Sequence, residues 1–282
     1  MSHQIYKKQK SFVNKVKALA KRWGLCFGGF MKLWLLGLSI LVLLVAAIQE
    51  SDATNYELSI NEPINYSREL ASEDQEKIKV MVIDSGITPL PQFKNFLSKA
   101  NSKKDLTDTH GHGTHVTGLI LYGRGLGDRV CKEVVIYSCK AFYPELHTPT
   151  NCFKAAKNFG IDIVNFSGGG TLVVKEEEKA VSEFKGIIVA ATGNEHSDIS
   201  KAPFFPASYK EVVAVGNGRD SKNRSLSSNY GLEKIVWIDG EDILSFSNKK
   251  DEYVLMTGSS QSAALYTHEL LKAKCQRLKS AK

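Results

Sequence analysis

The sequence predicts a three-layer α/β fold with a mostly parallel central sheet. Six short runs rich in valine and isoleucine are nearly continuous in hydrophobicity, as are strands that are buried on both faces of a parallel sheet. Helical patterns separate several of these runs, which favours layered β-α-β units with right-handed crossovers. Polar residues stand where three of the runs end. The carboxyl ends of parallel strands are where such folds bind ligands.

The expected elements follow one another along most of the chain. Strands are expected at 78–84, 133–140, 161–166, 186–191, 211–216 and 234–238. Helices are expected near 113–121, 151–159 and 174–185, and a last helix from 260 to 278. The chain has 282 residues, 43% of them hydrophobic and 24% charged, so it can bury a sizeable core and is not a wholly disordered protein.

The net charge of +7 is concentrated at the N-terminus. Residues 1–32 hold eight of the 37 basic residues and no acidic residue, which leaves 29 basic and 30 acidic residues in the remainder. The globular part is therefore close to neutral, and we expect no nucleic-acid partner.

An uncharged hydrophobic run of sixteen residues follows this basic tail, at 33–48. As a helix it would be about 24 Å long, somewhat short of the roughly 30 Å hydrocarbon core of a bilayer. The charge step places 1–32 in the cytoplasm as a basic tail and 49–282 outside, because positive charge stays on the cytoplasmic side. Residues 33–48 are either a signal peptide cut after Ala47 or a single-pass membrane anchor that gives the protein a membrane partner. A buried core helix is the remaining alternative.

Four cysteines follow the hydrophobic run, an even number that fits export. Cys131 and Cys139 stand eight residues apart beside one predicted strand, too far to bond if the strand is extended. A bond between Cys139 and Cys152 remains open, as does the alternative of four small buried thiols.

Four polar segments carry the groups expected for nucleophilic chemistry. Asp84 ends the first predicted strand, and His112 stands where a helix is expected to begin, so the pair is suited to general-base catalysis. Ser260 stands at the start of the last predicted helix, where backbone N–H groups favour developing negative charge. Asn194 follows a glycine in a predicted turn, and its amide can donate a hydrogen bond to an oxyanion.

These segments resemble motifs of the subtilisin-like serine proteases, the subtilases. Residues 80–86 resemble the aspartate motif, 112–118 the histidine motif, 190–195 the segment with the oxyanion asparagine, and 257–263 the serine motif. The chain order Asp, His, Ser is the order found in subtilisin. The resemblance implies that 49–282 is a peptidase domain with the subtilisin-like fold.

The resemblance also implies a role for each residue. Ser260 would be the nucleophile of a serine endopeptidase, His112 its general base and Asp84 the carboxylate that orients the base. Asn194 would bind the oxyanion, and the substrate-binding strand would be Ser167, Gly168 and Gly169. The substrate would be a polypeptide, cleaved outside the cytoplasm by an exported or membrane-anchored enzyme. No cofactor or catalytic metal is expected, and the sequence does not support a structural calcium ion.

Some positions depart from the family pattern and leave two alternatives open. Gly168 stands where the family usually has leucine, which predicts a more open pocket wall, and Ser259 replaces a threonine. One alternative is a catalytically silent binding module with the same fold. The other is a metal-dependent hydrolase that uses Asp108, His110, His112 and His115, since histidine is the commonest metal ligand.

Overall fold

The computed structural model describes residues 71–142 and 149–280. The predicted basic tail, the hydrophobic run at 33–48 and the Ala47 cleavage site lie outside the described residues. Within the described part, no helix is long and apolar enough to cross a membrane.

Six parallel strands form the central sheet, which confirms the predicted α/β architecture. Their order across the sheet is β2-β1-β3-β4-β5-β6. The strands are β1 (Ile78–Asp84), β2 (Val134–Lys140), β3 (Ile163–Phe166), β4 (Ile187–Ala191), β5 (Val212–Asn217) and β6 (Ile235–Ile238). In the register, Ile83 of β1 pairs with Phe166 of β3, and Phe166 pairs with Ala190 of β4. The ends of these three neighbouring strands therefore lie together at one edge of the sheet.

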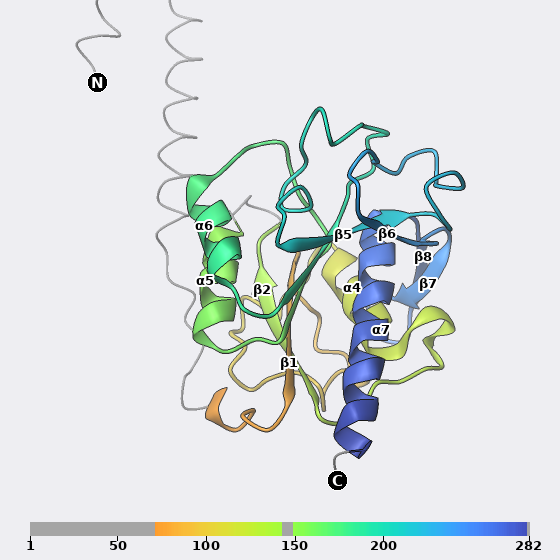
Figure 1. Ribbon diagram of the computed structural model, residues 1–282. Helices are drawn as coiled ribbons and strands as arrows, with labels where there is room; N and C mark the ends of the chain where they lie inside the picture. Colours follow the sequence, from red (N-terminus) through yellow and green to blue (C-terminus); the bar gives the residue numbers. More distant parts are fainter. Residues whose placement is uncertain (1–70, 143–148, 281–282) are drawn as a thin grey trace, which may run out of the picture. The chain divides into compact units, whose positions relative to one another are not determined.

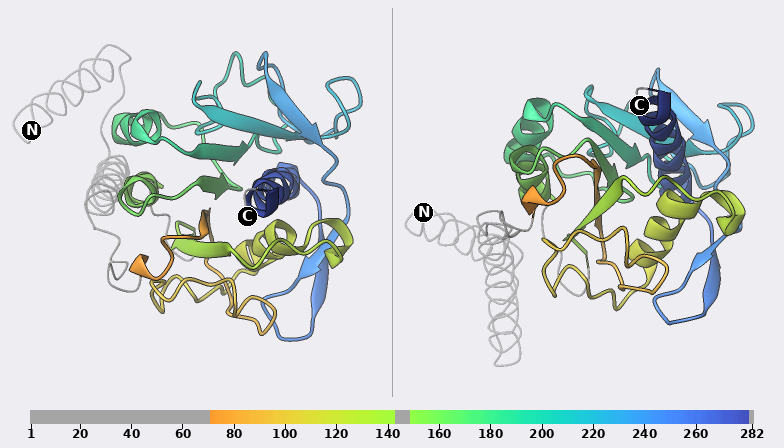
Figure 2. Two further views of the ribbon diagram at one scale, coloured as in Figure 1. Left: turned by 60° about the horizontal axis from the view of Figure 1, so that its bottom comes forward. Right: turned by 90° about the horizontal axis from the view of Figure 1, so that it is seen from below.

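Helices cover both faces of the sheet and complete the three layers. Helices α5 (Thr150–Asn158) and α6 (Lys175–Glu183) lie on one face, and α4 (His112–Tyr122) and α7 (Ser259–Ser280) lie on the other (Figures 1 and 2). Successive side chains of a strand point to opposite faces. Val82 accordingly belongs to the core under α4 and α7, while its neighbour Ile83 belongs to the core under α5 and α6. This double burial explains the continuous hydrophobic runs in the sequence.

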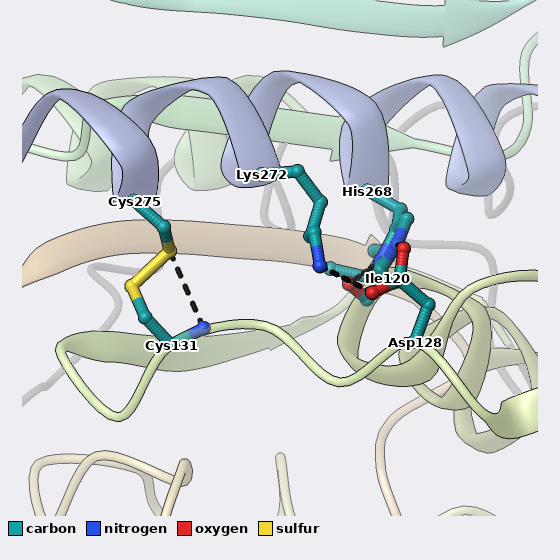
Figure 3. Close-up of a disulfide and its surroundings, with 6 residues drawn as sticks. All are labelled: Ile120, Asp128, Cys131, His268, Lys272 and Cys275. Carbon is teal, nitrogen blue, oxygen red and sulfur yellow. Dashed lines mark hydrogen bonds and ion pairs between the residues drawn. A yellow bond between two sulfur atoms is a disulfide. The ribbon is translucent and has the colours of Figure 1, made fainter.

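A disulfide links helix α7 to the loop before β2. Cys275 of α7 is bonded to Cys131, and Lys272 and His268 of the same helix contact Asp128 of that loop (Figure 3). A second bond joins Cys139 to Cys152, the pairing that the sequence left open.

One element was not expected from the sequence. Strands β7 (Ile243–Phe246) and β8 (Tyr253–Met256) form a separate antiparallel hairpin beside α4. A short 3₁₀ helix, η1 (Arg124–Leu126), follows α4. The predicted strands and helices otherwise agree with the structure to within two residues at each end.

Candidate active site

Asp84 and His112 are in direct contact at the carboxyl edge of the sheet. Asp84 ends β1 and is 1% exposed, and its Oδ1 atom accepts a hydrogen bond from His112 Nδ1 at 2.7 Å. His112 is the first residue of α4, and Gly111 before it has φ 96°, a left-handed conformation that glycine adopts without steric cost. The predicted proximity of a strand-end carboxylate and a helix-start histidine is therefore present in the structure.

The surroundings of His112 favour its protonated form. Burial lowers the pKa of the imidazole, but the charge and hydrogen bond of Asp84, with a smaller contribution from Asp108, raise it more. The net result is a His112 pKa above its ordinary value. A histidine held in this way can accept a proton and remain stabilised as the imidazolium ion.

Asp108 fixes the loop that leads into α4. Its Oδ1 atom accepts hydrogen bonds from Ser85 Oγ and from the backbone N–H groups of His110 and Gly111, at 2.9, 3.1 and 2.7 Å. Its Oδ2 atom accepts from the N–H and the hydroxyl of Thr114, at 2.9 and 2.6 Å. The sequence suggested Asp108 only as a metal ligand. In the structure this buried carboxylate accepts five hydrogen bonds and positions the start of the histidine helix.

Ser260 lies beside the segment that follows β3. Its Oγ atom donates to the backbone carbonyl of Ser167 at 3.0 Å, and Ser167 Oγ donates to the carbonyl of Ser260 at 3.0 Å. A buried chain of hydrogen bonds holds Ser167 in place. Thr267 of α7 donates to Asn165, and the amide of Asn165 donates to Ser167 Oγ. Among the described residues, no hydrogen bond joins Ser260 to His112.

Asn194 is held against the start of α7 by its side-chain oxygen. Its Oδ1 atom accepts from the N–H of Ser259 at 2.9 Å and from the Ser259 hydroxyl at 3.1 Å. The amide Nδ2 group then remains as the donor end of this exposed side chain. A β-carbon on Gly258 would lie 3.0 Å from Nδ2, and φ there is 152°, so the close approach depends on glycine.

The segment after β3 carries the three residues predicted to bind substrate. Ser167 is buried, whereas Gly169 is exposed, and Gly170 pairs in antiparallel fashion with Phe205. The expectation of an open wall at Gly168 was wrong. A β-carbon on Gly168 would lie 2.4 Å from Cζ of Phe142, so an aromatic ring fills that space.

The two histidines beside His112 differ from it in environment. His115 is fully buried, and its Nε2 atom donates to the carbonyl of Ile243 at 3.0 Å. Burial lowers the pKa of His115 to about 4, so its ring is neutral at pH 7. The ring of His110 lies 6.2 Å from that of His112, on an exposed loop. Residues 71–142 and 149–280 contain no group of three or more His, Cys, Asp or Glu side chains that could hold a metal ion.

Asp, His and Ser side chains at the carboxyl edge of a parallel sheet are typical of serine hydrolases. The subtilase family model matches residues 75–277 of this chain. The chain therefore belongs to the subtilase family.

Individual relatives agree with this assignment. The Major intracellular serine protease of Bacillus subtilis (strain 168) is 33% identical over 210 residues, which cover 67% of this chain and 65% of the relative. The Minor extracellular protease Epr of the same strain is 31% identical over 198 residues, which cover 66% of this chain but 30% of the relative. The matches thus span less than two thirds of either relative.

A solved structure shows the same fold at lower identity. The epidermin leader peptide processing serine protease EpiP from Staphylococcus aureus aligns with a TM-score of 0.62 and 20% identity. The alignment covers 73% of this chain and 68% of EpiP. The central sheet and its covering helices are thus shared with a solved serine protease.

Proposed function

We propose that this chain is a serine endopeptidase that hydrolyses polypeptides through Asp84, His112 and Ser260. The observation that carries the proposal is the 2.7 Å contact between a buried carboxylate and a histidine at the helix start. Ser260 lies in the first turn of α7, which packs against β3 and β4, the strands that lead to Ser167 and Asn194. No cofactor is required for this chemistry.

Each side chain has a separate task in the proposed reaction. Ser260 Oγ attacks the scissile carbonyl while His112 Nε2 takes its proton, and His112 later gives this proton to the leaving amine. Asp84 holds the tautomer of His112 with the free Nε2 toward the serine. Asn194 Nδ2 and the N–H of Ser260 donate to the oxyanion.

The hydroxyl of Ser260 has to change its hydrogen-bond partner before it reacts. It donates to the Ser167 carbonyl at 3.0 Å, and rotation about its Cα–Cβ bond would release it toward His112. Catalytic hydrogen bonds are often loose without substrate and tighten when the substrate is bound. An extended peptide that pairs with Ser167, Gly168 and Gly169 would occupy this segment and favour the rotation.

The hydrogen bond from Ser260 Oγ to the Ser167 carbonyl would also fit a catalytically silent binding module, so it does not distinguish the two functions. A fluorophosphonate probe distinguishes the two functions, because it forms a covalent bond only with an activated serine. We expect labelling at Ser260 in the natural protein and none in His112→Ala. A protein that binds peptides but is never labelled would be a binding module.

Double substitution tests whether Ser260 and His112 act as one unit. Ser260→Ala and His112→Ala should each remove nearly all peptidase activity, and the double variant should lose little more than either alone. The measurement is kcat/KM for a peptide substrate at pH 8, with Asn223→Ala in an exposed turn as control. Losses that multiply would contradict the shared mechanism.

A location outside the cytoplasm is part of the proposal. The eight basic residues of 1–32, which precede the uncharged run at 33–48, support this orientation. Two disulfides, Cys131–Cys275 and Cys139–Cys152, also support it, since such bonds persist mainly in oxidising compartments. Whether 33–48 anchors the protein or is cleaved after Ala47 is decided by N-terminal sequencing of the mature protein.

A further inference from the structure

The ring of Phe204 contacts two backbone segments that flank Ser260. A β-carbon added to Gly169 would lie 2.3 Å from Cε1 of Phe204, and one added to Gly193 would lie 3.1 Å from the same atom. Gly169 belongs to the proposed substrate strand, and Gly193 directly precedes Asn194. One edge of the aromatic ring therefore lies close to both segments, and on the Gly193 side Asn229 Nδ2 and Glu195 Oε2 are nearer still, each 2.4 Å from the added β-carbon.

The space between the two segments is where a substrate side chain has to go, a step that rests on the proposed function. A carbonyl carbon bonded to Ser260 Oγ has its oxygen at the asparagine amide. The backbone before that carbon pairs with the segment that contains Gly169. The side chain on the amino side of the scissile bond then points between Gly169 and Gly193, toward the ring of Phe204.

Hydrogen bonds fix the backbone that carries this ring. The N–H of Phe204 donates to Ser208 Oγ at 3.0 Å, and its carbonyl accepts from the N–H of Ser208 at 2.9 Å. The next residue, Phe205, exchanges two hydrogen bonds with Gly170, at 2.7 and 2.9 Å. A backbone shift that moved the ring away from Gly169 would break the hydrogen bonds between Phe205 and Gly170. Each broken hydrogen bond would cost free energy.

We infer that Phe204 restricts cleavage to sites that follow a small residue, glycine, alanine or serine. A methyl or hydroxymethyl group adds few atoms between the two glycines. A leucine, phenylalanine or lysine side chain would overlap the ring, and such overlap is strongly unfavourable in a packed site. The selectivity therefore comes mainly from exclusion of large side chains.

Peptides that differ only in the residue before the scissile bond test this inference. With the natural protein, kcat/KM for the alanine peptide should exceed that for the phenylalanine peptide by about 100-fold or more. In Phe204→Ala the ratio should fall at least about tenfold, because the ring no longer fills the space. Phe205→Ala is the matched control. Its ring packs against Tyr209, 4.7 Å away, and the variant should keep the natural ratio.

The outcomes separate this inference from the proposed function. Fluorophosphonate labelling of Ser260 reports a correctly formed site in each variant, independently of peptide preference. A labelled natural protein that cleaves faster after phenylalanine than after alanine would overturn the inference alone. A natural protein that is neither labelled nor able to cleave any peptide of the series would overturn both. If Phe204→Ala does not fold, the preference of the natural protein decides.

Discussion

At the scale of single residues, His112 would set the pH range of activity in the proposed mechanism. The base must be unprotonated, and Asp84 holds its pKa above the ordinary value of about 6.5. We therefore expect kcat/KM to rise with pH through a midpoint above 6.5. The measurement is the pH profile of kcat/KM.

Asp84→Asn is the partner variant for this profile. It removes the charge that raises the His112 pKa and leaves the burial that lowers it. The midpoint should move to lower pH, and kcat should fall about 10⁴-fold because the wrong tautomer faces the serine. An unchanged midpoint would show that another group titrates.

Asn194 should act on the transition state more than on substrate binding. Asn194→Ala removes an amide whose oxygen is held by Ser259, so the oxyanion loses a preorganised donor. We expect kcat to fall about 10²–10³-fold with KM nearly constant. Steady-state kinetics on one peptide measures both constants. A change confined to KM would remove Asn194 from the oxyanion site.

The contact between Asp84 and His112 was predictable from the sequence, whereas several partners of the candidate site were not. Asp84 and His112 stand at the end of a strand and the start of a helix, so local pattern predicted their contact. The place of Phe204 depends on an approach between segments far apart in the chain, whereas four of the five hydrogen bonds of Asp108 come from residues two to six positions away. Gly168 shows the same limit, because the nearby ring belongs to Phe142, which no spacing rule connects to it.

At the scale of elements, the disulfide from α7 should contribute more to the free energy of unfolding than the disulfide from α5. The Cys131–Cys275 bond spans a sequence separation of 144 residues, and Cys139–Cys152 spans 13. Loop-closure entropy gives about 5 kcal/mol for the long loop and about 3 kcal/mol for the short one. Replacing the pair Cys131 and Cys275 with serine should therefore lower the free energy of unfolding more than replacing the pair Cys139 and Cys152.

Denaturant unfolding in a Ser260→Ala background measures this order without self-digestion. The starting Ser260→Ala protein with both bonds intact is the control. A larger loss for the Cys139–Cys152 pair would mean that strain or residual structure outweighs chain entropy.

Helix α6 contains a carboxyl group that should make stability depend on pH. Burial raises the pKa of Glu177 to about 7, and a hydrogen bond from Tyr209 lowers it only in part. The folded state therefore holds this proton more tightly than the unfolded state, and stability is lost as pH rises from about 4.5 through 7. We expect a loss on the order of 3 kcal/mol at pH 8.

Glu177→Gln removes this dependence. In the Ser260→Ala background it should raise the unfolding free energy at pH 8 and change it little at pH 4.5. Glu178→Gln, at the exposed neighbouring position, should have little effect at either pH. Equal effects of Glu177→Gln at both pH values would contradict the buried-proton account.

The elements themselves were predictable where burial left a clear pattern. Strands β1 to β6 lie in a parallel sheet, so their apolar runs marked them in the sequence. The β7–β8 hairpin was not predicted because it lies outside the parallel sheet and leaves Leu244 and Leu255 43% and 58% exposed. Apolar residues that face solvent remove the alternation by which a surface strand is recognised.

At the scale of the whole molecule, the direction of insertion is the main prediction. The basic tail at 1–32 should remain in the cytoplasm and the peptidase domain should be outside. A reporter that is active only in the cytoplasm should be silent when fused after Lys282. The same reporter fused before Met1 should be active, which controls for expression. Activity of the fusion after Lys282 would reverse the proposed orientation.

The position of Ser260 at the start of α7 also sets an order of events during synthesis. Asp84, His112 and Asn194 are all translated before Ser260, the proposed nucleophile. Helix α7 must then pack against β3, β4 and β5 before the serine reaches the edge of the sheet. A growing chain therefore carries an incomplete site, and the proposed peptidase would be unable to digest itself or its neighbours until the layer that contains α7 has formed.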